Sequence, residues 1–235
     1  MTSLWRVFAA CLGWAVLGGL GCPRTTPPEP PRPPASQQVN SHMTPLEVVP
    51  LPRMKVTQGE LGEQPDGWLT VRTARMRAVV PGSKTAQAVL RFKLSGPSTE
   101  QRAFESGELR QQVGLKLRAM DGCNVLYVMW RIAPKPGVVV NYKRNPDMHH
   151  SNDCGNAGYT TVRPSQQSQA SAPAPGLETE HTLRADLDAG VLRVWADDAL
   201  VWAGKLPPQA LELEGPVGLR SDNVRVALQL AVPRP

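Results

Sequence analysis

Five basic and aromatic side chains in the middle of the chain have the chemistry of a binding surface. They lie in segments where every second residue is apolar, which is the period of a β-strand, at the positions opposite the apolar set. Cations attract anionic ligands, and an aromatic ring packs against the apolar face of a sugar ring. If the strands are neighbours in one sheet, these side chains form one face. The predicted ligand-binding residues are Lys116, Arg118, Tyr127, Arg131 and Lys143.

Neighbouring polar residues extend this predicted surface. Asn141 and Arg144 continue it, and the polar loop of residues 149–154 is expected to assist binding. The alternative is an ordinary solvated sheet face, which alternates in the same way. Losing one exposed Lys or Arg should weaken binding by about 1 kcal/mol or less. Losing Tyr127 should matter more, because stacking buries apolar area that salt does not screen.

Acidic and metal-binding residue types also occur, but their context favours turns and loops. Asp186 and Asp188 could bind calcium, or could cap backbone amides in a turn, which is the interpretation that we favour. Adjacent His149 and His150 precede Cys154 in a loop that has the ligand types of a zinc site. Adjacent histidines point apart on a strand, and a disulfide-bonded cysteine is not a ligand. A polar surface loop is therefore favoured, and no metal or other cofactor is predicted.

Cys123 and Cys154 are expected to form a disulfide. An export signal at the N-terminus would bring the domain into an oxidising compartment. Cys11 is lost with that signal and Cys22 is expected to carry lipid, so two thiols remain. The bond would close a loop of about 30 residues, for which the chain-entropy estimate is roughly 3–4 kcal/mol. It would hold the polar loop against the sheet.

The elements that carry these residues predict an all-β fold, an antiparallel β-sandwich (jelly roll) over residues 46–235. With 24 prolines and 20 glycines and no long 3.6-residue apolar period, the chain is not mostly helical. Short alternating segments joined by polar turns are typical of a sandwich. Residues 43–64 are expected to be mostly irregular, and 162–176 reads as a long loop or a linker between two halves. The expected strands are 68–80, 88–94, 110–119, 124–132, 138–143, 181–187, 191–195, 200–202, 215–221 and 223–232, with an edge strand near 46–49.

The stretches HTLRADLDAGVLRVWADDALVWAG and GPVGLRSDNVRVALQL near the C-terminus carry a family signal. They resemble the closing strands of concanavalin A-like lectin/glucanase jelly rolls, including laminin-G-like domains, with residues 192–201 and 215–221 in the motif positions. Ala199 stands where that family often has glycine. The resemblance covers roughly the last quarter of the chain well, and the rest only by strand pattern. It implies a fold, and a fold alone does not define function.

The N-terminal segments predict export and anchoring. Residues 1–21 read as a lipoprotein signal peptide, whose apolar run is too short for a comfortable membrane span. It ends in Gly21-Cys22, similar to the lipobox of bacterial lipoproteins, although Gly19 stands where leucine is preferred. A plain signal peptide or an unprocessed anchor are the alternatives. Residues 22–45 are proline-rich and read as an extended tether, with a PxxP ligand as the alternative.

These features favour a lipoprotein anchored in a bacterial cell envelope, most simply at the outer membrane, whose non-catalytic module binds a polysaccharide. Excess positive charge on the predicted face favours an acidic polymer, whereas scattered Lys and Arg give no indication of nucleic acid. Glycanases of the resembling fold carry paired carboxylates on one strand. The nearest pair here, Glu178 and Glu180, lies at a loop edge. A glycoside hydrolase or lyase with an unrecognised site, and a structural protein-binding lipoprotein, are the alternatives.

Overall fold

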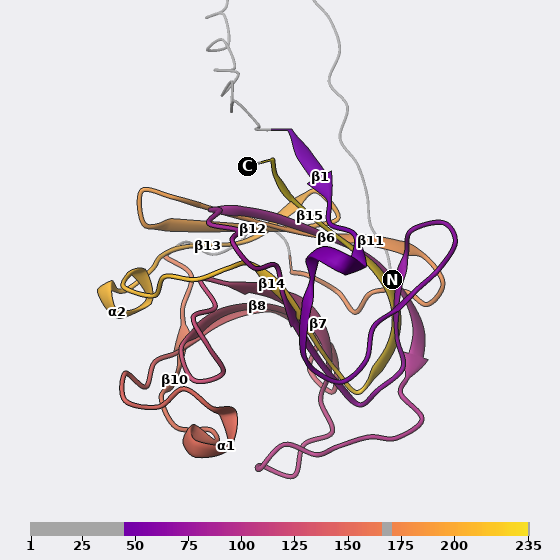
Figure 1. The fold of residues 1–235 in the computed structure, drawn as a ribbon, viewed down its shortest axis with the longest axis horizontal. Helices are drawn as coiled ribbons and strands as arrows, with labels where there is room; N and C mark the ends of the chain where they lie inside the picture. Colours follow the sequence, from indigo (N-terminus) through magenta and orange to yellow (C-terminus); the bar gives the residue numbers. More distant parts are fainter. Residues whose placement is uncertain (1–44, 166–170, 235) are drawn as a thin grey trace, which may run out of the picture. The chain divides into compact units, whose positions relative to one another are not determined.

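The computed structural model describes residues 45–165 and 171–234. The predicted signal peptide, the predicted lipidation site Cys22 and nearly all of the predicted tether lie outside the described residues. Within the described part, two antiparallel sheets pack face to face, as Figure 1 shows edge-on. The predicted antiparallel β-sandwich is confirmed. No helix in these two ranges is long and apolar enough to cross a membrane.

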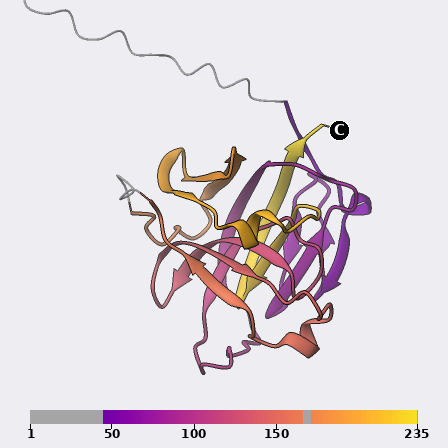
Figure 2. The same ribbon diagram turned by 90° about the vertical axis from the view of Figure 1, so that its left-hand side faces the viewer.

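The upper layer in Figure 1 is an eight-stranded sheet. Its strands, in spatial order, are β13 (Ala199–Lys205), β12 (Val191–Ala196), β11 (Glu180–Asp188), β6 (Gln87–Pro97), β15 (Val224–Pro233), β4 (Leu69–Val71) and β3 (Gly62–Glu63). The short β1 (Leu46–Val48) also pairs with β15. Figure 2 shows the end of the yellow β15 beside the indigo β1.

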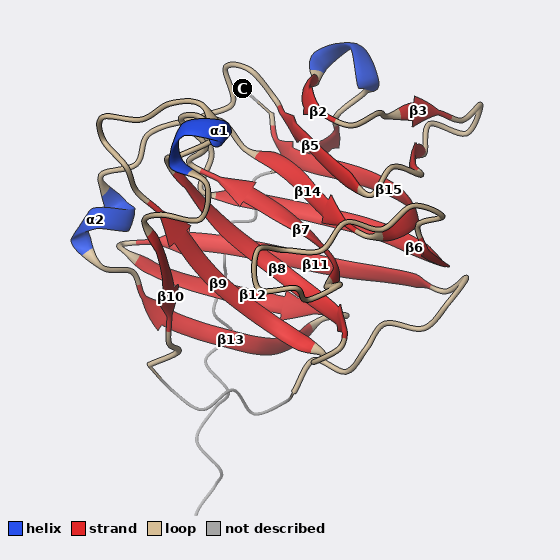
Figure 3. Ribbon diagram, turned by 90° about the horizontal axis from the view of Figure 1, so that it is seen from below, coloured by secondary structure: helices blue, strands red, loops and turns tan. Residues whose placement is uncertain are grey.

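The lower layer is a seven-stranded sheet, and its outer face is the one that Figure 3 views. Its strands, in spatial order, are β10 (Tyr159–Val162), β9 (Gly137–Lys143), β8 (Val125–Ala133), β7 (Gln111–Leu117), β14 (Gly218–Asp222), β5 (Arg75–Val79) and β2 (Lys55–Gln58). The described helices are single turns: η1 (Leu51–Arg53), α1 (Ser151–Cys154) and α2 (Pro208–Leu211). In Figure 3, α1 lies over one end of this sheet.

The hydrophobic core fills the space between the two sheets. Alternate residues of β8, including Val128 and Trp130, point into it, as the two-residue period predicts. Trp130 meets Phe92 of β6 edge to face, with ring centroids 5.5 Å apart. The indole N–H of Trp130 donates to the backbone carbonyl of Pro173 at 2.8 Å, so burial leaves no unpaired donor. The opposite residues of β8 are thereby directed to the outer face.

One predicted strand is wrong in its extent. The sequence predicts a single strand over residues 68–80, whereas the structure divides it into β4 in one sheet and β5 in the other. The buried residues change phase, from Leu69 and Val71 at odd positions to Met76 and Ala78 at even positions. A strand cannot change phase without a break, and the chain crosses between the sheets at that point.

The remaining predicted strands differ from the observed ones only at their ends. The sequence did not predict β2, β3 and β10, which lie near sheet edges. All four residues of β2 are exposed, and so are three of the four in β10. Without a buried face these strands carry no alternating apolar signal.

Candidate functional site

The outer face of the seven-stranded sheet gathers most of the predicted ligand-binding residues. Lys116 of β7 pairs across the strands with Tyr127 of β8 on one side and with Gly218 of β14 on the other. Arg131 lies further along β8 on the same side as Tyr127. The pairing of β7 with β14 joins segments about 100 residues apart in sequence. These residues therefore lie on one surface because of the sheet register.

An ion network occupies the centre of this face. The Asp222 carboxylate accepts hydrogen bonds from Arg77 at 2.6 Å, Arg220 at 2.8 Å and Gln112 at 2.7 Å. Asp222, Gln112 and Arg220 are all buried. Burial alone would raise the pKa of Asp222, but Arg220, Arg77 and the bond from Gln112 hold it well below its usual value. Asp222 therefore stays ionised and balances one of two guanidinium charges.

Two stacked tyrosines adjoin this network. The rings of Tyr127 and Tyr159 lie 6.0 Å apart, and the Arg220 guanidinium lies 4.6 Å from the Tyr127 ring centroid. Arg220 also donates to the Tyr159 hydroxyl at 3.1 Å. Burial raises the pKa of Tyr127 to about 12. Burial would also raise the pKa of Tyr159, but Arg220 lowers it below its usual value. Tyr127 is only 5% exposed and Tyr159 is 39% exposed, so Tyr159 is the ring that a ligand can reach.

A first depression, which we call the Tyr159 hollow, has a volume of about 260 Å³. No acidic residue is among the described side chains that line it. The Arg110 guanidinium lies 4.8 Å from the Phe104 ring centroid. The buried Nε atoms of Arg110 and Arg131 have no hydrogen-bond partner in the described part of the chain. The principal lining residues are Phe104, Arg110, Gln112, Tyr127, Arg131, Asn141, Asn156, Tyr159 and Arg220.

A second depression, the Lys116 hollow, has a volume of about 610 Å³ and shares Tyr127 with the first. Lys116 is 5% exposed. Its ammonium has no hydrogen bond and no ion pair within 4 Å among residues 45–165 and 171–234. Burial, with Arg77 and Arg220 nearby, lowers the pKa of Lys116 to about 8. The principal lining residues are Lys55, Thr57, Arg77, Lys116, Asp121, Tyr127, His149, His150 and Ser151.

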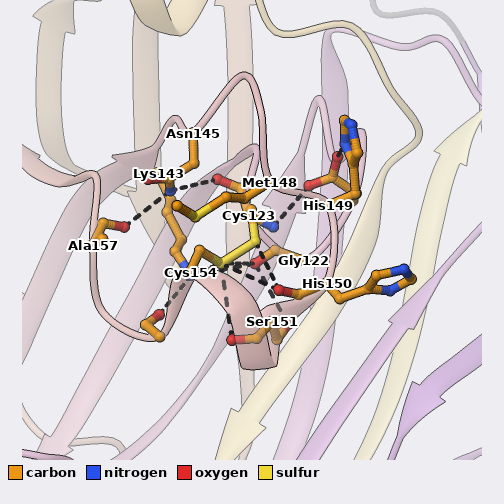
Figure 4. Close-up of a disulfide and its surroundings, with 12 residues drawn as sticks. Gly122, Cys123, Lys143, Asn145, Met148, His149, His150, Ser151, Cys154 and Ala157 are labelled. Atoms are coloured by element: carbon orange, nitrogen blue, oxygen red, sulfur yellow. Dashed lines mark hydrogen bonds and ion pairs between the residues drawn. A yellow bond between two sulfur atoms is a disulfide. The ribbon is translucent and has the colours of Figure 1, made fainter.

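The predicted disulfide is confirmed, and it fixes the loop that walls the Lys116 hollow. Cys123 and Cys154 are joined by an S–S bond of 2.04 Å, shown in Figure 4. The Lys143 ammonium donates to the Gly155 carbonyl at 2.6 Å and lies 2.7 Å from Cys154 Sγ. Burial lowers the pKa of Lys143. Lys143 therefore stabilises the loop through its contacts with Cys154 and Gly155.

Asn124 and Asp121 also form hydrogen bonds that hold the same loop. The Asn124 amide donates to the carbonyls of Asn145 and Met148, each at 3.0 Å. Asp121 accepts from the backbone N–H groups of Cys123 and Asn124 at 2.7 and 2.8 Å. The other Asp121 oxygen lies 2.8 Å from His149 Nδ1. These contacts hold His149 at the edge of the hollow.

The five predicted ligand-binding residues therefore have different positions. Lys116, Tyr127 and Arg131 line the two hollows. Lys143 is buried under the loop and its ammonium is engaged there. Arg118 is not part of the face, because β7 ends at Leu117 and Arg118 has a left-handed φ of 50°. Its guanidinium donates to the carbonyls of Leu211 and Leu213 at 2.7 and 2.6 Å.

Several residues of the face were not singled out from the sequence. In β14, Arg220 and Asp222 alternate with the core residue Leu219, so alternation could have placed them on the outer face. Phe104 and Tyr159 come from segments without an apolar period, and no signal in the sequence indicates them. Their positions depend on a loop and an edge strand.

Two of the acidic residues considered for calcium binding or catalysis, Asp186 and Glu180, have side-chain partners within the eight-stranded sheet. Asp186 accepts from the Gln87 amide at 3.0 Å. Glu180 forms an exposed ion pair with Arg91 at 2.6 Å, and Glu178 has a φ of 58° in the preceding loop. Among residues 45–165 and 171–234 there is no group of three His, Cys, Asp or Glu side chains that could hold a metal ion.

Comparisons with known proteins bear on the fold. No protein-family model matches the chain, and no curated protein gives a significant match. A carbohydrate-binding module (CBM66) from Bacillus subtilis superposes with a TM-score of 0.51 and 11% identity, covering 75% of this chain and 91% of that one. This likeness shows a shared β-sandwich fold.

Two further solved structures are similar at TM-scores below 0.5. Domain 4 of AbnA, a GH43 extracellular arabinanase from Geobacillus stearothermophilus solved with arabinotriose, gives 0.43 at 8% identity, covering 77% of this chain and 82% of that one. The Crh5 transglycosylase, solved with NAG, gives 0.47 at 14% identity, covering 81% and 84%. Neither adds to the argument for the site.

Proposed function

We propose that the sandwich is a non-catalytic module that binds a polysaccharide on the outer face of its seven-stranded sheet. The observation that supports this best is the Tyr159 hollow, where a reachable aromatic ring adjoins three arginines and three amide side chains. The CBM66 structure, which has the same fold, is a carbohydrate-binding module. The fold supplies no residue roles, and the chemistry of the face carries the proposal.

The groups in this hollow match those of a sugar residue. A sugar ring has an apolar face, which packs on an aromatic ring, and a rim of hydroxyl groups. Asn141, Asn156 and Gln112 can donate to and accept from hydroxyls. Arginine binds carboxylates through two parallel hydrogen bonds. Arg110 is already paired with Glu108, whereas Arg131 has no ion pair among the described residues and can take a ligand carboxylate. An acidic polysaccharide is therefore the favoured ligand class.

The state of Asp222 supports binding over hydrolysis. A glycosidase needs one carboxylic acid that donates a proton and a second carboxylate near it. Asp222 is ionised and its oxygens are bound to Arg77, Arg220 and Gln112, so it has no proton to give. Its role is to keep the two guanidinium groups in place.

A polysaccharide lyase is the second candidate, and one contact favours it. The Tyr159 phenol lies 3.1 Å from Arg220 and has a lowered pKa. A phenolate could remove the proton beside a sugar carboxylate while an arginine binds that carboxylate. The Tyr159 phenol would return that proton to the glycosidic oxygen as its bond to the sugar carbon breaks, and a carbon–carbon double bond would form. Ultraviolet absorbance of the unsaturated product separates this activity from binding alone.

Anchoring in a bacterial envelope completes the proposal. It rests on residues 1–45, where an apolar run ends in Gly21-Cys22 before a proline-rich stretch. Acylation of Cys22 would attach the chain to a membrane, and an extended proline-rich tether would hold the module away from it. The outer membrane is the proposed location.

A glycan array tests the proposed function directly. Full-length chain solubilised in detergent is applied to acidic and neutral polysaccharides at low and high salt. The expected result is binding to acidic polymers that weakens as salt rises, because exposed charges are screened. Failure to bind any polysaccharide would overturn the proposal and leave a protein-binding lipoprotein as the remaining candidate.

A further inference from the structure

We propose that the Lys116 hollow is a second subsite, in which the Lys116 ammonium binds the carboxylate of an acidic sugar residue. This inference rests on the proposed polysaccharide-binding function and adds the group that selects the ligand. The Tyr159 hollow would hold the neighbouring residue of the same polymer, because Tyr127 lines both depressions.

The charge of Lys116 is unpaired within the described residues. Lys116 is 95% buried, yet its ammonium has no hydrogen bond or ion pair within 4 Å in the described ranges. Buried charges in proteins are normally paired, because an unpaired one loses its hydration without compensation. Lys116 also lines a depression that a ligand can enter. A bound anion would supply the missing partner.

Most of the other charged groups near Lys116 already have partners. Arg77 and Arg220 are bound to Asp222. Asp121, the acidic residue among the lining side chains, accepts two backbone N–H bonds and contacts His149, so it is held in its own turn. On the sheet, Gly218 opposite Lys116 has no side chain that could pair with it. The remaining cation of the wall, Lys55, adds positive charge at the edge.

The size and the lining of the Lys116 hollow indicate the class of ligand. The hollow of about 610 Å³ lies within the range of roughly 300–1,000 Å³ that is usual for small-molecule sites. Its wall contains neutral hydrogen-bonding side chains, including Thr57, Ser151 and Asn152, which suit hydroxyl groups. Val79 and Pro216 add apolar surface for a ring face. One buried unpaired cation, Lys116, among hydroxyl-binding groups fits a uronic acid better than a densely charged polyanion.

The test compares Lys116→Met with Arg193→Met, which removes the same charge from an exposed residue of the opposite sheet. Both are titrated as full-length chain against polygalacturonate and its neutral methyl ester. Lys116→Met should bind polygalacturonate about tenfold more weakly than wild type, the loss expected for one charge-assisted hydrogen bond. It should bind the ester unchanged. Arg193→Met should behave like wild type with both polymers.

A stability measurement keeps this test independent of folding. Because Lys116 is an unpaired buried cation, Lys116→Met should unfold at a higher temperature than wild type while binding more weakly. A residue with a structural role alone would lower the unfolding temperature when replaced. Lys116→Gln serves as a second neutral variant, with the same weakened binding expected.

Four outcomes would overturn the subsite. Unchanged polygalacturonate binding by Lys116→Met, with weaker binding by Tyr159→Ala, would reject it while the proposed function stands. Equal losses for Lys116→Met and Arg193→Met would indicate general charge attraction. If dextran sulfate bound as strongly as polygalacturonate and this binding depended on Lys116, the site would not be specific for carboxylates. If polyglutamate did so, the site would not be specific for sugars. Failure of wild type to bind any glycan would instead reject the proposed function.

Discussion

At the scale of single residues, Asp222 supplies the counter-charge for the two arginines at the centre of the outer face. Replacing Asp222 by asparagine leaves Arg77 and Arg220 buried without their counter-charge. Breaking a buried ion pair in this way costs about 3–5 kcal/mol, so we expect a loss of that order in urea unfolding at pH 7. Glu180→Gln is the control, because its pair with Arg91 is exposed and worth about 1 kcal/mol or less. Equal losses in the two variants would contradict this account.

The lowered pKa of Asp222 also predicts a pH dependence. A carboxyl group whose pKa falls on folding stabilises the protein fully above its unfolded pKa, about 3.9. That contribution is lost as pH falls below this value toward the folded-state pKa. Wild type should therefore lose unfolding free energy more steeply in this acid range than Asp222→Asn does. Parallel curves would show that Asp222 is not the titrating group.

The charge of Lys116 has the opposite effect on stability to the charge of Asp222. Its pKa falls from 10.5 to about 8 on folding, so its charge destabilises the native state at pH 7. Lys116→Met should raise the unfolding free energy there by about 2–3 kcal/mol. Wild type should regain this difference as pH rises from about 8 to 10.5, because the unfolded chain binds more protons in that window. Denaturant unfolding of wild type and Lys116→Met across this pH range measures the difference. A lower unfolding free energy for Lys116→Met at pH 7 would contradict the prediction.

At the scale of elements, alternation predicts the strands of the sandwich and the outer direction of Tyr127 and Arg131. It fails where the phase changes between β4 and β5, and where a positive φ ends β7 before Arg118. Alternation also cannot give the register that joins β7 to β14, because this pairing is far apart in sequence. Much of the site, including Arg77 beside Asp222, therefore depends on tertiary pairing.

The disulfide is the element-scale prediction. Replacing both Cys123 and Cys154 by serine should cost roughly 3–4 kcal/mol in unfolding free energy, because the open chain gains entropy. It should also loosen the loop that carries His149 and His150 and weaken binding of acidic more than neutral glycans. Denaturant unfolding and glycan titration of the double variant measure both effects. Unchanged binding would show that the loop does not form a wall of the site.

At the scale of the whole molecule, attachment and binding are separate properties. We expect a fatty-acid probe to label the wild-type chain in cells and Cys22→Ala to lose the label, because the acyl chain is attached to that thiol. Glycan binding by the module should not change. Labelling that survives Cys22→Ala would contradict the predicted lipid anchor.

The measurement that tests the central claim most directly is the affinity of the full-length chain for polygalacturonate in three variants. Tyr159→Ala removes the reachable ring, Tyr159→Phe keeps the ring and removes the hydroxyl, and Arg193→Ala changes the opposite sheet. The account predicts a loss of about 1 kcal/mol or more, or at least fivefold, for Tyr159→Ala. Tyr159→Phe should lose less, and Arg193→Ala should match wild type. Wild-type affinity in both Tyr159 variants would contradict the claim that this face binds the polysaccharide.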